Sequence, residues 1–321
     1  MNRYARQMIL PEVGTQGQVR LAAARVLVVG AGGLAAPVLP VLAGAGLGHL
    51  TLLDADTVDV TNLHRQTLFT ESDCGMPKAA AAAARLRALN SEITVETRCE
   101  ALTPVNAANL VVAADLVLDC ADSYAASYTL SDTCLDLGKP LISASVLGMT
   151  GYCGGFCGGA PSLRAVFPDA PDSGASCATA GVLGPVVGMI GALQAQMALA
   201  VLLGLKPSPL GQMVQIGARD FRFSSFRFDR APEPDAPFRF ISPAQVRDSD
   251  TIIELRGADE APEPLHPNAA RIAPEDLPGA LPDGDGRLVL CCATGLRSWR
   301  AADRIQQDWP GEIALAAAAI S

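Results

Sequence analysis

The chain has 321 residues, of which 50% are hydrophobic and 18% are charged, with a formal net charge of −9. This length suits one large α/β domain with a small second one, or two of medium size, and the apolar content excludes wholesale disorder. The acidic balance argues against nucleic-acid binding through a broad basic face. The N-terminal MNRYARQMIL lacks the pattern of a secretory signal, so we expect a cytoplasmic protein.

Short apolar runs alternate with helical patterns along the first half of the chain. Runs without polar alternation are typical of strands that are buried on both faces. The Ala-rich segment Lys78–Asn90 predicts a helix. The alternation predicts a parallel sheet with helices on both faces. The predicted strands are Arg25–Gly30, His49–Asp54, Ile93–Arg98, Asp115–Cys120 and Pro140–Ser145.

The pattern changes after Ser145. A glycine- and aromatic-rich stretch and the alternating segment Gln212–Phe228 predict antiparallel strands, so we expect a mixed sheet. The apolar stretch Val182–Leu203 is long enough to span a membrane, but its proline and two glutamines favour a buried core helix. We therefore expect no membrane partner.

Prolines and charges mark residues 230–240 as a linker, because such segments stay extended and do not form a core. The chain is thereby divided into a first domain, residues 1–229, and a second domain, residues 241–321. In the second, the runs TIIELR and RLVLCC and a final helical pattern predict a small α/β domain.

The glycine-rich loop GAGGLA follows the first strand and opens a helix. Its glycines, Gly30, Gly32 and Gly33, allow close approach of a phosphate, which the free N–H groups at the helix start attract. Asp54 ends the next strand, where a ribose-binding carboxylate is expected. These features predict a nucleotide site without distinguishing NAD from ATP.

Charged residues near the same sheet edge favour ATP. Arg65 is suited to forked hydrogen bonds with phosphates. Lys78 opposes the dipole of the helix that it begins, which favours an anionic partner over a solvated surface position. Asp122 follows another predicted strand, where a carboxylate can hold Mg²⁺ or cap the following helix, and both roles are compatible.

These motifs resemble, in order, those of the ThiF, MoeB and HesA proteins of the E1-like superfamily. The matching segments are RYARQMIL, VLVVGAGGLA, LTLLDADTVDVTNLHRQTLF, PKAAAAAARLRALN, LVLDCADS and CATAGVLGPVVGMIGALQA. The resemblance implies a Rossmann-like activating-enzyme fold and a homodimer that binds ATP and Mg²⁺. It implies adenylylation of the C-terminal glycine of a ubiquitin-like sulfur-carrier protein of the ThiS or MoaD type.

The resemblance also implies roles for individual residues. Asp122 would bind Mg²⁺, and Arg6 would reach into the ATP site of the partner subunit. Arg6, Arg65, Lys78 and Asp122 are the implied catalytic residues of adenylylation. The residues implied to bind the nucleotide are Gly30, Gly32, Gly33, Asp54, Asp56, Asn62, Arg65, Gln66, Lys78, Asp122 and Ser123.

Two departures from the family pattern stand out. Many relatives carry two CxxC pairs that hold structural zinc, and this sequence has no CxxC pair, so we predict no zinc site. Ser123 occupies a position where many relatives have Asn, which should perturb the site only modestly.

Two of the nine cysteines are candidate sulfur carriers. Cys177 precedes a helix, which favours a thiolate, and it matches a loop cysteine that links covalently to the activated carrier in some relatives. It is alternatively a conveniently small residue. The segment CCATGLRS resembles the rhodanese active-site loop, in a register that makes Cys292 the catalytic thiol with N–H groups around its persulfide. The alternative is an inactive rhodanese-like remnant.

Two other functions remain in view. An NAD-dependent oxidoreductase accounts for the glycine loop and Asp54, but not for the charged set that contains Arg65 and Asp122. A scaffold that binds a carrier without catalysis has no need for that set. The sequence leaves open whether the sulfur donor is a cysteine desulfurase. It also leaves open whether the sulfur reaches thiamin, molybdopterin, cysteine or a secondary metabolite.

Overall fold

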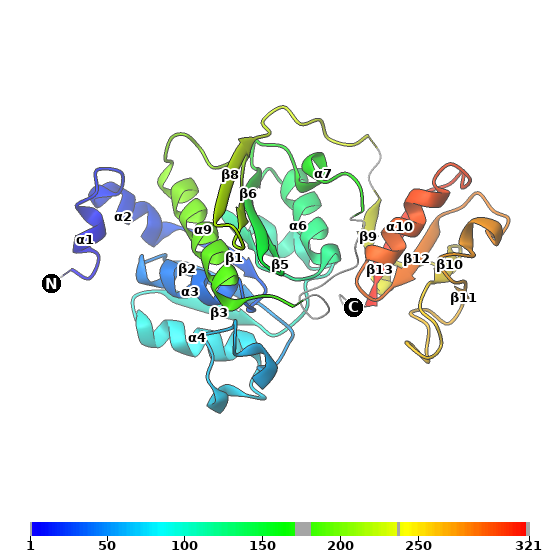
Figure 1. The fold of residues 1–321 in the computed structure, drawn as a ribbon, viewed down its shortest axis with the longest axis horizontal. Helices are drawn as coiled ribbons and strands as arrows, with labels where there is room; N and C mark the ends of the chain where they lie inside the picture. The colour runs from blue at the N-terminus through cyan, green and yellow to red at the C-terminus, as the bar shows by residue number, and fades with distance from the viewer. Residues whose placement is uncertain (1, 171–180, 236–237, 319–321) are drawn as a thin grey trace.

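The computed structural model describes residues 2–170, 181–235 and 238–318. A large sheet occupies its centre and a smaller sheet lies beside it (Figure 1). Helices α1 (Ala5–Met8) and α2 (Gly14–Ala23) stand at the end of the molecule that is remote from the smaller sheet.

The large sheet has eight strands in the order β3-β2-β1-β4-β5-β6-β7-β8. Strands β1 to β5 pair in parallel, and β6 to β8 extend one edge as antiparallel neighbours, so the predicted mixed α/β sheet is confirmed. Its strands are β1 (Arg25–Val29), β2 (His49–Leu53), β3 (Thr94–Arg98), β4 (Leu116–Asp119), β5 (Pro140–Leu147), β6 (Thr150–Cys157), β7 (Gln212–Gly217) and β8 (Arg222–Arg227).

Strand β1 shows why these runs are buried on both faces. Val26 and Val28 belong to the apolar cluster on one face, and Leu27 and Val29 belong to the cluster on the other. Helices α3, α4 and α9 cover the first face, and α5 and α6 cover the second. The remaining helices of this part of the chain are α3 (Ala35–Gly44), α4 (Lys78–Leu89), α5 (Ala107–Val112), α6 (Tyr124–Asp136), α7 (Leu163–Val166) and α9 (Gly184–Leu203), with short 3-10 turns η1 (Val60–Asn62) and η2 (Glu71–Asp73).

Helix α9 is, among the described residues, long and apolar enough to cross a membrane by length and composition. It packs against β5, β6 and α3, and 50% of its most apolar window is buried. Its Gln194 is fully buried, and Nε2 of this side chain donates hydrogen bonds to the backbone carbonyl oxygens of Asp119 and Ile142 at 2.7 and 3.1 Å. This is the core packing predicted from the glutamines in the stretch.

The smaller sheet has five parallel strands in the order β11-β10-β12-β13-β9. Helix α10 (Leu296–Ile305) packs against β12 and β13. The strands and short turns are β9 (Arg239–Ile241), η3 (Pro243–Gln245), β10 (Thr251–Glu254), β11 (Ala270–Arg271), η4 (Leu277–Gly279), β12 (Leu288–Cys292) and β13 (Ile313–Ala317). Because β9 begins at Arg239, the last two residues of the predicted 230–240 linker belong to this sheet.

Candidate functional site

The loop after β1 lies at the carboxyl edge of the large sheet, where ligands bind in open α/β folds. Gly30 has a φ of +93°, and a Cβ placed on it would lie 2.6 Å from the carbonyl oxygen of Cys120. A Cβ on Gly33 would lie 2.9 Å from Cγ1 of Val187 in α9. Gly30 therefore requires glycine, whereas a Cβ at Gly33 would need the Val187 side chain to shift, and the loop is pressed between the end of β4 and the start of α9.

Asp54 joins the end of β2 to this loop. Its carboxylate accepts the backbone N–H groups of Ala31 at 2.6 Å and Asp56 at 2.7 Å. Burial raises the pKa of Asp54 above its usual value, although the two N–H groups oppose the rise. The structure thus places the predicted ribose-binding carboxylate directly against the glycine loop.

Arg65, Asn62 and Gln66 lie on the other side of the loop. The Arg65 guanidinium donates to Oδ1 of Asn62 at 2.8 Å, and Nε2 of Gln66 donates to the same oxygen at 3.3 Å. A Cβ on Gly33 would be 3.5 Å from Cγ of Arg65, and one on Gly32 would be 3.6 Å from Nε2 of Gln66. The cationic and amide side chains therefore border the loop glycines, as the resemblance implied.

The amide of Gln66 supplies a test of whether a polar ligand fits here. Gln66 is 3% exposed, and its Oε1 is buried without a hydrogen-bond partner in the described part of the chain. A buried oxygen left unpaired costs about 1–3 kcal/mol, which a bound ligand or water that donates to it would offset. The arginine and the loop N–H groups suit phosphate oxygens, whereas the unsatisfied amide oxygen suits a hydroxyl or N–H donor of the same ligand.

Lys78 begins α4 and is buried, with 6% exposure. Its Nζ donates to Oδ2 of Asp56 at 2.7 Å, and its backbone N–H donates to the carbonyl oxygen of the same residue. The lysine is therefore not a solvated surface residue. Its anionic partner in this structure is Asp56, whose side chain is 72% exposed and hence open to exchange for a ligand.

Asp122 follows β4 at the same edge and is exposed. The N-cap of α6 is Ser123, so Asp122 does not cap the helix, and the Ser123 side chain makes no capping hydrogen bond either. Within the described residues, Oγ of Ser123 is buried without a partner. An exposed carboxylate is an oxygen ligand of the kind that Mg²⁺ prefers.

Sequence reasoning missed two residues next to the site. Asp119 at the end of β4 is fully buried and accepts the Ser143 hydroxyl at 2.7 Å and the N–H of Ala121 at 3.2 Å. Burial raises the pKa of Asp119 to about 6. The other residue is His64, whose Nε2 lies 2.8 Å from Nη1 of Arg65. Neither residue stands out in the sequence, because Asp119 ends an apolar run and His64 lies within a polar one.

Arg6 does not reach the site of its own chain. It is exposed on α1, and the following helix α2 contacts the far end of α9, where Arg20 donates to the carbonyl oxygen of Leu203 at 3.1 Å. The glycine loop instead contacts Val187 near the start of α9. Sixteen residues of helix separate these two points, a distance of about 24 Å at 1.5 Å per residue.

Cys292 ends β12 in the smaller sheet and is fully buried. Its Sγ accepts the N–H groups of Gly295 at 3.1 Å and Ser298 at 3.4 Å, and lies 3.4 Å from the Ser298 hydroxyl. Cys291 faces the other side of the sheet, and burial raises its pKa to about 12. The structure thus surrounds the predicted thiol, and not its neighbour, with N–H donors. Cys177 lies outside the described residues.

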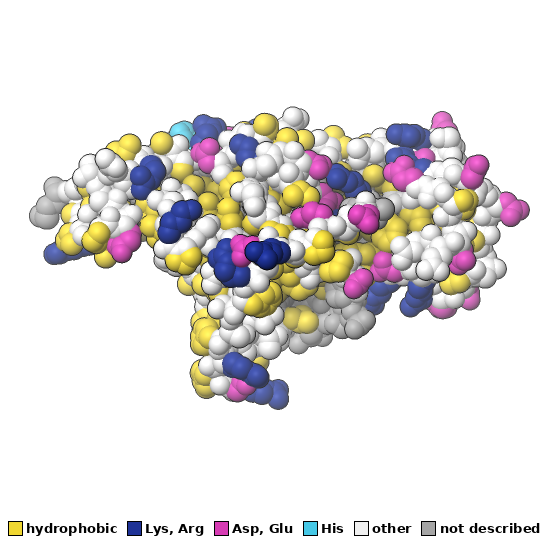
Figure 2. Space-filling model, turned by 90° about the horizontal axis from the view of Figure 1, so that it is seen from above, with side chains coloured by type: hydrophobic (Ala, Val, Ile, Leu, Met, Phe, Trp, Pro, Cys, Tyr) yellow, Lys and Arg dark blue, Asp and Glu magenta, His cyan; other side chains and the backbone are white. Residues whose placement is uncertain are grey.

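The described residues contain no group of three or more His, Cys, Asp or Glu side chains that could hold a metal ion. Cys153 and Cys157 are buried in the core, and burial raises the pKa of Cys157 to about 12. On the face that Figure 2 shows, basic and acidic side chains are interspersed, and no broad basic field appears there.

The sheet and the glycine loop with its charged neighbours at the carboxyl edge define a nucleotide-binding α/β protein of the Rossmann type. The chain belongs to the ThiF family, whose model matches residues 4–238. It is 46% identical over 233 residues to the "adenylyltransferase and sulfurtransferase MOCS3" of Bos taurus, covering 72% of this chain and 51% of that protein. The corresponding uba4 protein of Pyricularia oryzae is 43% identical over 254 residues, covering 75% and 51%. The chain spans about half the length of these curated relatives.

The fold also resembles that of E. coli MccB crystallised with ATP. The TM-score is 0.63 at 23% identity, covering 72% of this chain and 73% of that chain. At this identity the likeness concerns the fold.

Proposed function

We propose that the chain uses ATP to adenylate the C-terminal carboxylate of a ubiquitin-like sulfur-carrier protein, and that it couples this step to sulfur transfer. The observation that carries the proposal is the convergence of Arg65, Asn62 and Gln66 on the glycine loop, with Asp122 at the same edge. The MOCS3 and uba4 relatives are named as adenylyltransferases and sulfurtransferases, which supports both halves of the proposal.

In the adenylylation step, the N–H groups of the loop bind phosphate oxygens and Asp54 binds the ribose. Arg65 and Lys78 stabilise charge that spreads over the phosphates. Asp122 would hold Mg²⁺, which when bound neutralises phosphate charge and orients the leaving pyrophosphate. The carrier carboxylate attacks the α-phosphorus in line, an O–P bond forms and pyrophosphate leaves, and no general base is needed because the nucleophile is already ionised.

In the sulfur-transfer step, Cys292 would carry a persulfide. The N–H groups of Gly295 and Ser298 that now meet its Sγ would stabilise the persulfide anion, as a helix start stabilises phosphate. We propose that the first domain, residues 1–229, performs adenylylation and that the C-terminal part is a rhodanese-like sulfurtransferase. A cysteine desulfurase or another donor would load Cys292.

We further propose a cytoplasmic homodimer in which Arg6 completes the ATP site of the partner subunit. The position of Arg6 supports this, because Arg6 precedes α2, and α2 contacts the end of α9 that is about 24 Å from the part of α9 beside the glycine loop.

The test is ATP–pyrophosphate exchange in the presence of a carrier protein that ends in Gly-Gly. Arg65→Ala and Asp122→Ala should each abolish exchange, whereas Arg222→Ala should leave it unchanged, because Arg222 pairs with Asp220 on exposed strand β8. Normal exchange in either of the first two variants would remove that residue from the mechanism.

A further inference from the structure

Helix α6 carries contacts to the smaller sheet along one face. Ala125, Tyr128, Asp132 and Asp136 are spaced by three, four and four residues, so they lie on the same side of the helix. At its start, a Cβ on Gly295 would lie 3.1 Å from Cβ of Ala125. At its other end, Arg239 of β9 donates to the Asp136 carboxylate at 2.8 Å.

The middle of this face is closed by aromatic and charged side chains. The rings of Tyr128 and Trp299 meet edge to face, with centroids 4.5 Å apart. Arg164 of α7 forms a buried ion pair with Asp132 at 2.7 Å, and its guanidinium lies 4.8 Å from the Tyr128 ring and 5.5 Å from the Trp299 ring. Trp299 belongs to α10 of the smaller sheet, so this cluster joins the two sheets.

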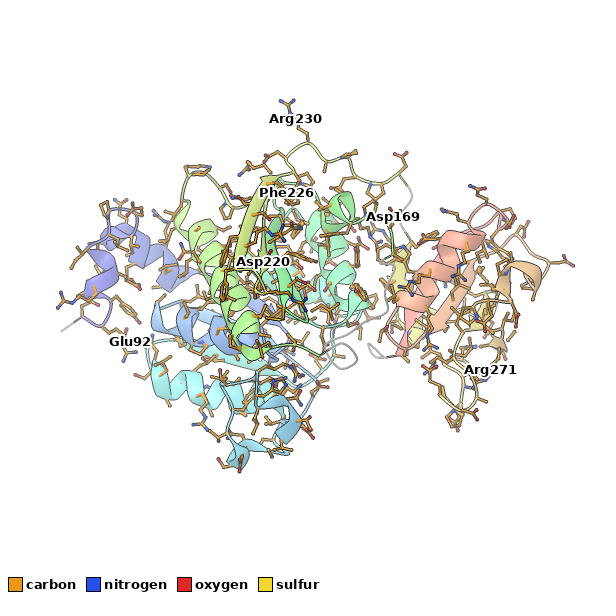
Figure 3. The ribbon with its side chains drawn as sticks, in the orientation of Figure 1. Glu92, Asp169, Asp220, Phe226, Arg230 and Arg271 are labelled. Atoms are coloured by element: carbon orange, nitrogen blue, oxygen red, sulfur yellow. The ribbon has the colours of Figure 1, made fainter. Side chains whose placement is uncertain are left out.

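The apolar core is continuous across the contact. One cluster of buried side chains contains Leu141 and Phe156 of the large sheet together with Ile253, Leu290 and Trp299 of the smaller one. Asp169, labelled in Figure 3, lies on the border that faces α10. Nearby, Asp303 of α10 accepts the backbone N–H of Ala170, and burial raises the pKa of Asp303. Packing of this kind resembles a domain interior more than a mobile domain boundary.

This contact places the loop around the Cys292 thiol against the start of α6. Asp122 of the nucleotide site lies just before the same end of α6. The Sγ of Cys292 is 3.1 Å from the N–H nitrogen of Gly295, which packs against Ala125. Ala125 lies three residues after Asp122, and only Tyr124 and Ala125 of this stretch belong to α6, so the intervening chain spans at most about 10 Å. Summing these contacts places Cys292 within roughly 20 Å of Asp122 in the same chain.

We propose that Cys292 serves the nucleotide site of its own chain, so that adenylylation and sulfur transfer onto one carrier take place in cis across α6. This inference rests on the proposed function. The terminal sulfur of the Cys292 persulfide attacks the carbonyl carbon of the acyl adenylate, a C–S bond forms, the C–O bond to phosphate breaks, and AMP leaves with the electron pair. A thiol reductant then attacks Cys292 Sγ of the acyl disulfide, and the carrier thiocarboxylate leaves.

The test is complementation between two defective chains. The Asp122→Ala chain and the Cys292→Ala chain are co-expressed with different tags, so that mixed dimers form during synthesis. The mixture is given ATP, Mg²⁺, inorganic polysulfide, dithiothreitol and a ThiS-type carrier that ends in Gly-Gly. Carrier thiocarboxylate is measured by mass spectrometry against wild type at the same chain concentration. The same mixture is repeated with Cys292→Ser in place of Cys292→Ala, to show that the result does not come from a packing defect at this position.

Action in cis predicts that the mixture forms no more thiocarboxylate than either variant alone, at least ten-fold below wild type. Action in trans would give about a quarter of the wild-type yield, because half of the dimers would be mixed and each would have one complete pair of sites. That yield would overturn the inference. Two separate readouts distinguish failure of the proposed function from failure of the inference. The Cys292→Ala chain should still catalyse pyrophosphate exchange, and Cys292 of the Asp122→Ala chain should still show the persulfide mass shift.

Discussion

Asp119→Asn is expected to change how stability depends on pH. The carboxylate is fully buried at the end of β4, and burial raises its pKa from 3.8 to about 6. The native state therefore holds a proton between about pH 4 and pH 6 that the unfolded state has already lost. The contribution of this proton to stability is complete below pH 4 and disappears as the pH rises through 6.

The size of the effect follows from the shift. A rise of about two pKa units corresponds to about 3 kcal/mol, which is an upper bound for the energetic penalty of the buried charge at pH 7. The asparagine keeps an oxygen for the N–H of Ala121 and an amide that can donate to the Ser143 hydroxyl. The variant should thus be more stable than wild type by up to about 3 kcal/mol at pH 7–8, and equally stable near pH 4.

The assay is urea unfolding of both proteins from pH 4 to pH 8. The control is Asp115→Asn, because Asp115 is exposed just before the same strand and accepts the N–H of Arg25. The difference in unfolding free energy between wild type and Asp119→Asn should grow between pH 4 and pH 6 and then stay constant. A difference that is independent of pH, or one that favours wild type at pH 7, would refute the reasoning.

Three further predictions concern the loop, the interface and the thiol. Gly30→Ala should lower stability by about 1–2 kcal/mol and weaken ATP binding, measured by unfolding and calorimetry, whereas Gly44→Ala at the end of α3, which meets no atom within 4 Å, should not lower stability and should leave ATP binding unchanged. Trp299→Ala should lower the free energy of unfolding by about 3–5 kcal/mol because the ring is 1% exposed, and a loss below 1 kcal/mol would contradict its place in the shared core. Cys292→Ala should eliminate the persulfide mass shift after polysulfide treatment while Cys291→Ala retains it; a shift that persists in Cys292→Ala would assign the sulfur to another cysteine.

The strands of the large sheet were predictable because parallel strands that are buried on both faces consist of continuous apolar runs, as in Arg25–Gly30. The glycine loop was predictable as well, since only glycine fits where a Cβ would meet the Cys120 carbonyl. Strands β9, β11 and β13 were not predicted. Strands β9 and β11 have only three and two residues, and β13 (Ile313–Ala317) is alanine-rich, a composition that equally favours a helix.

The contacts between distant segments could not be read from the sequence. Lys78 was expected to have an anionic partner, but local patterns do not reveal that Asp56 fills this place. The sequence divided the chain at its prolines, yet the two sheets share a core through α6. The face of α6 that joins them includes Tyr128 and Asp132, whose role depends on Trp299 and Arg164 from remote segments. A polar residue on an apolar helix face is ambiguous until its partner is placed.

The central claim is that the site at the carboxyl edge of the large sheet activates a peptide carboxylate with ATP. The most direct measurement is the intact mass of a Gly-Gly-ending carrier after incubation with the chain, ATP and Mg²⁺, with inorganic pyrophosphatase present to remove the product. The account predicts a carrier that has gained one AMP, and no such gain with Arg65→Ala. A carrier of unchanged mass, or a chain that binds NAD and not ATP, would contradict it.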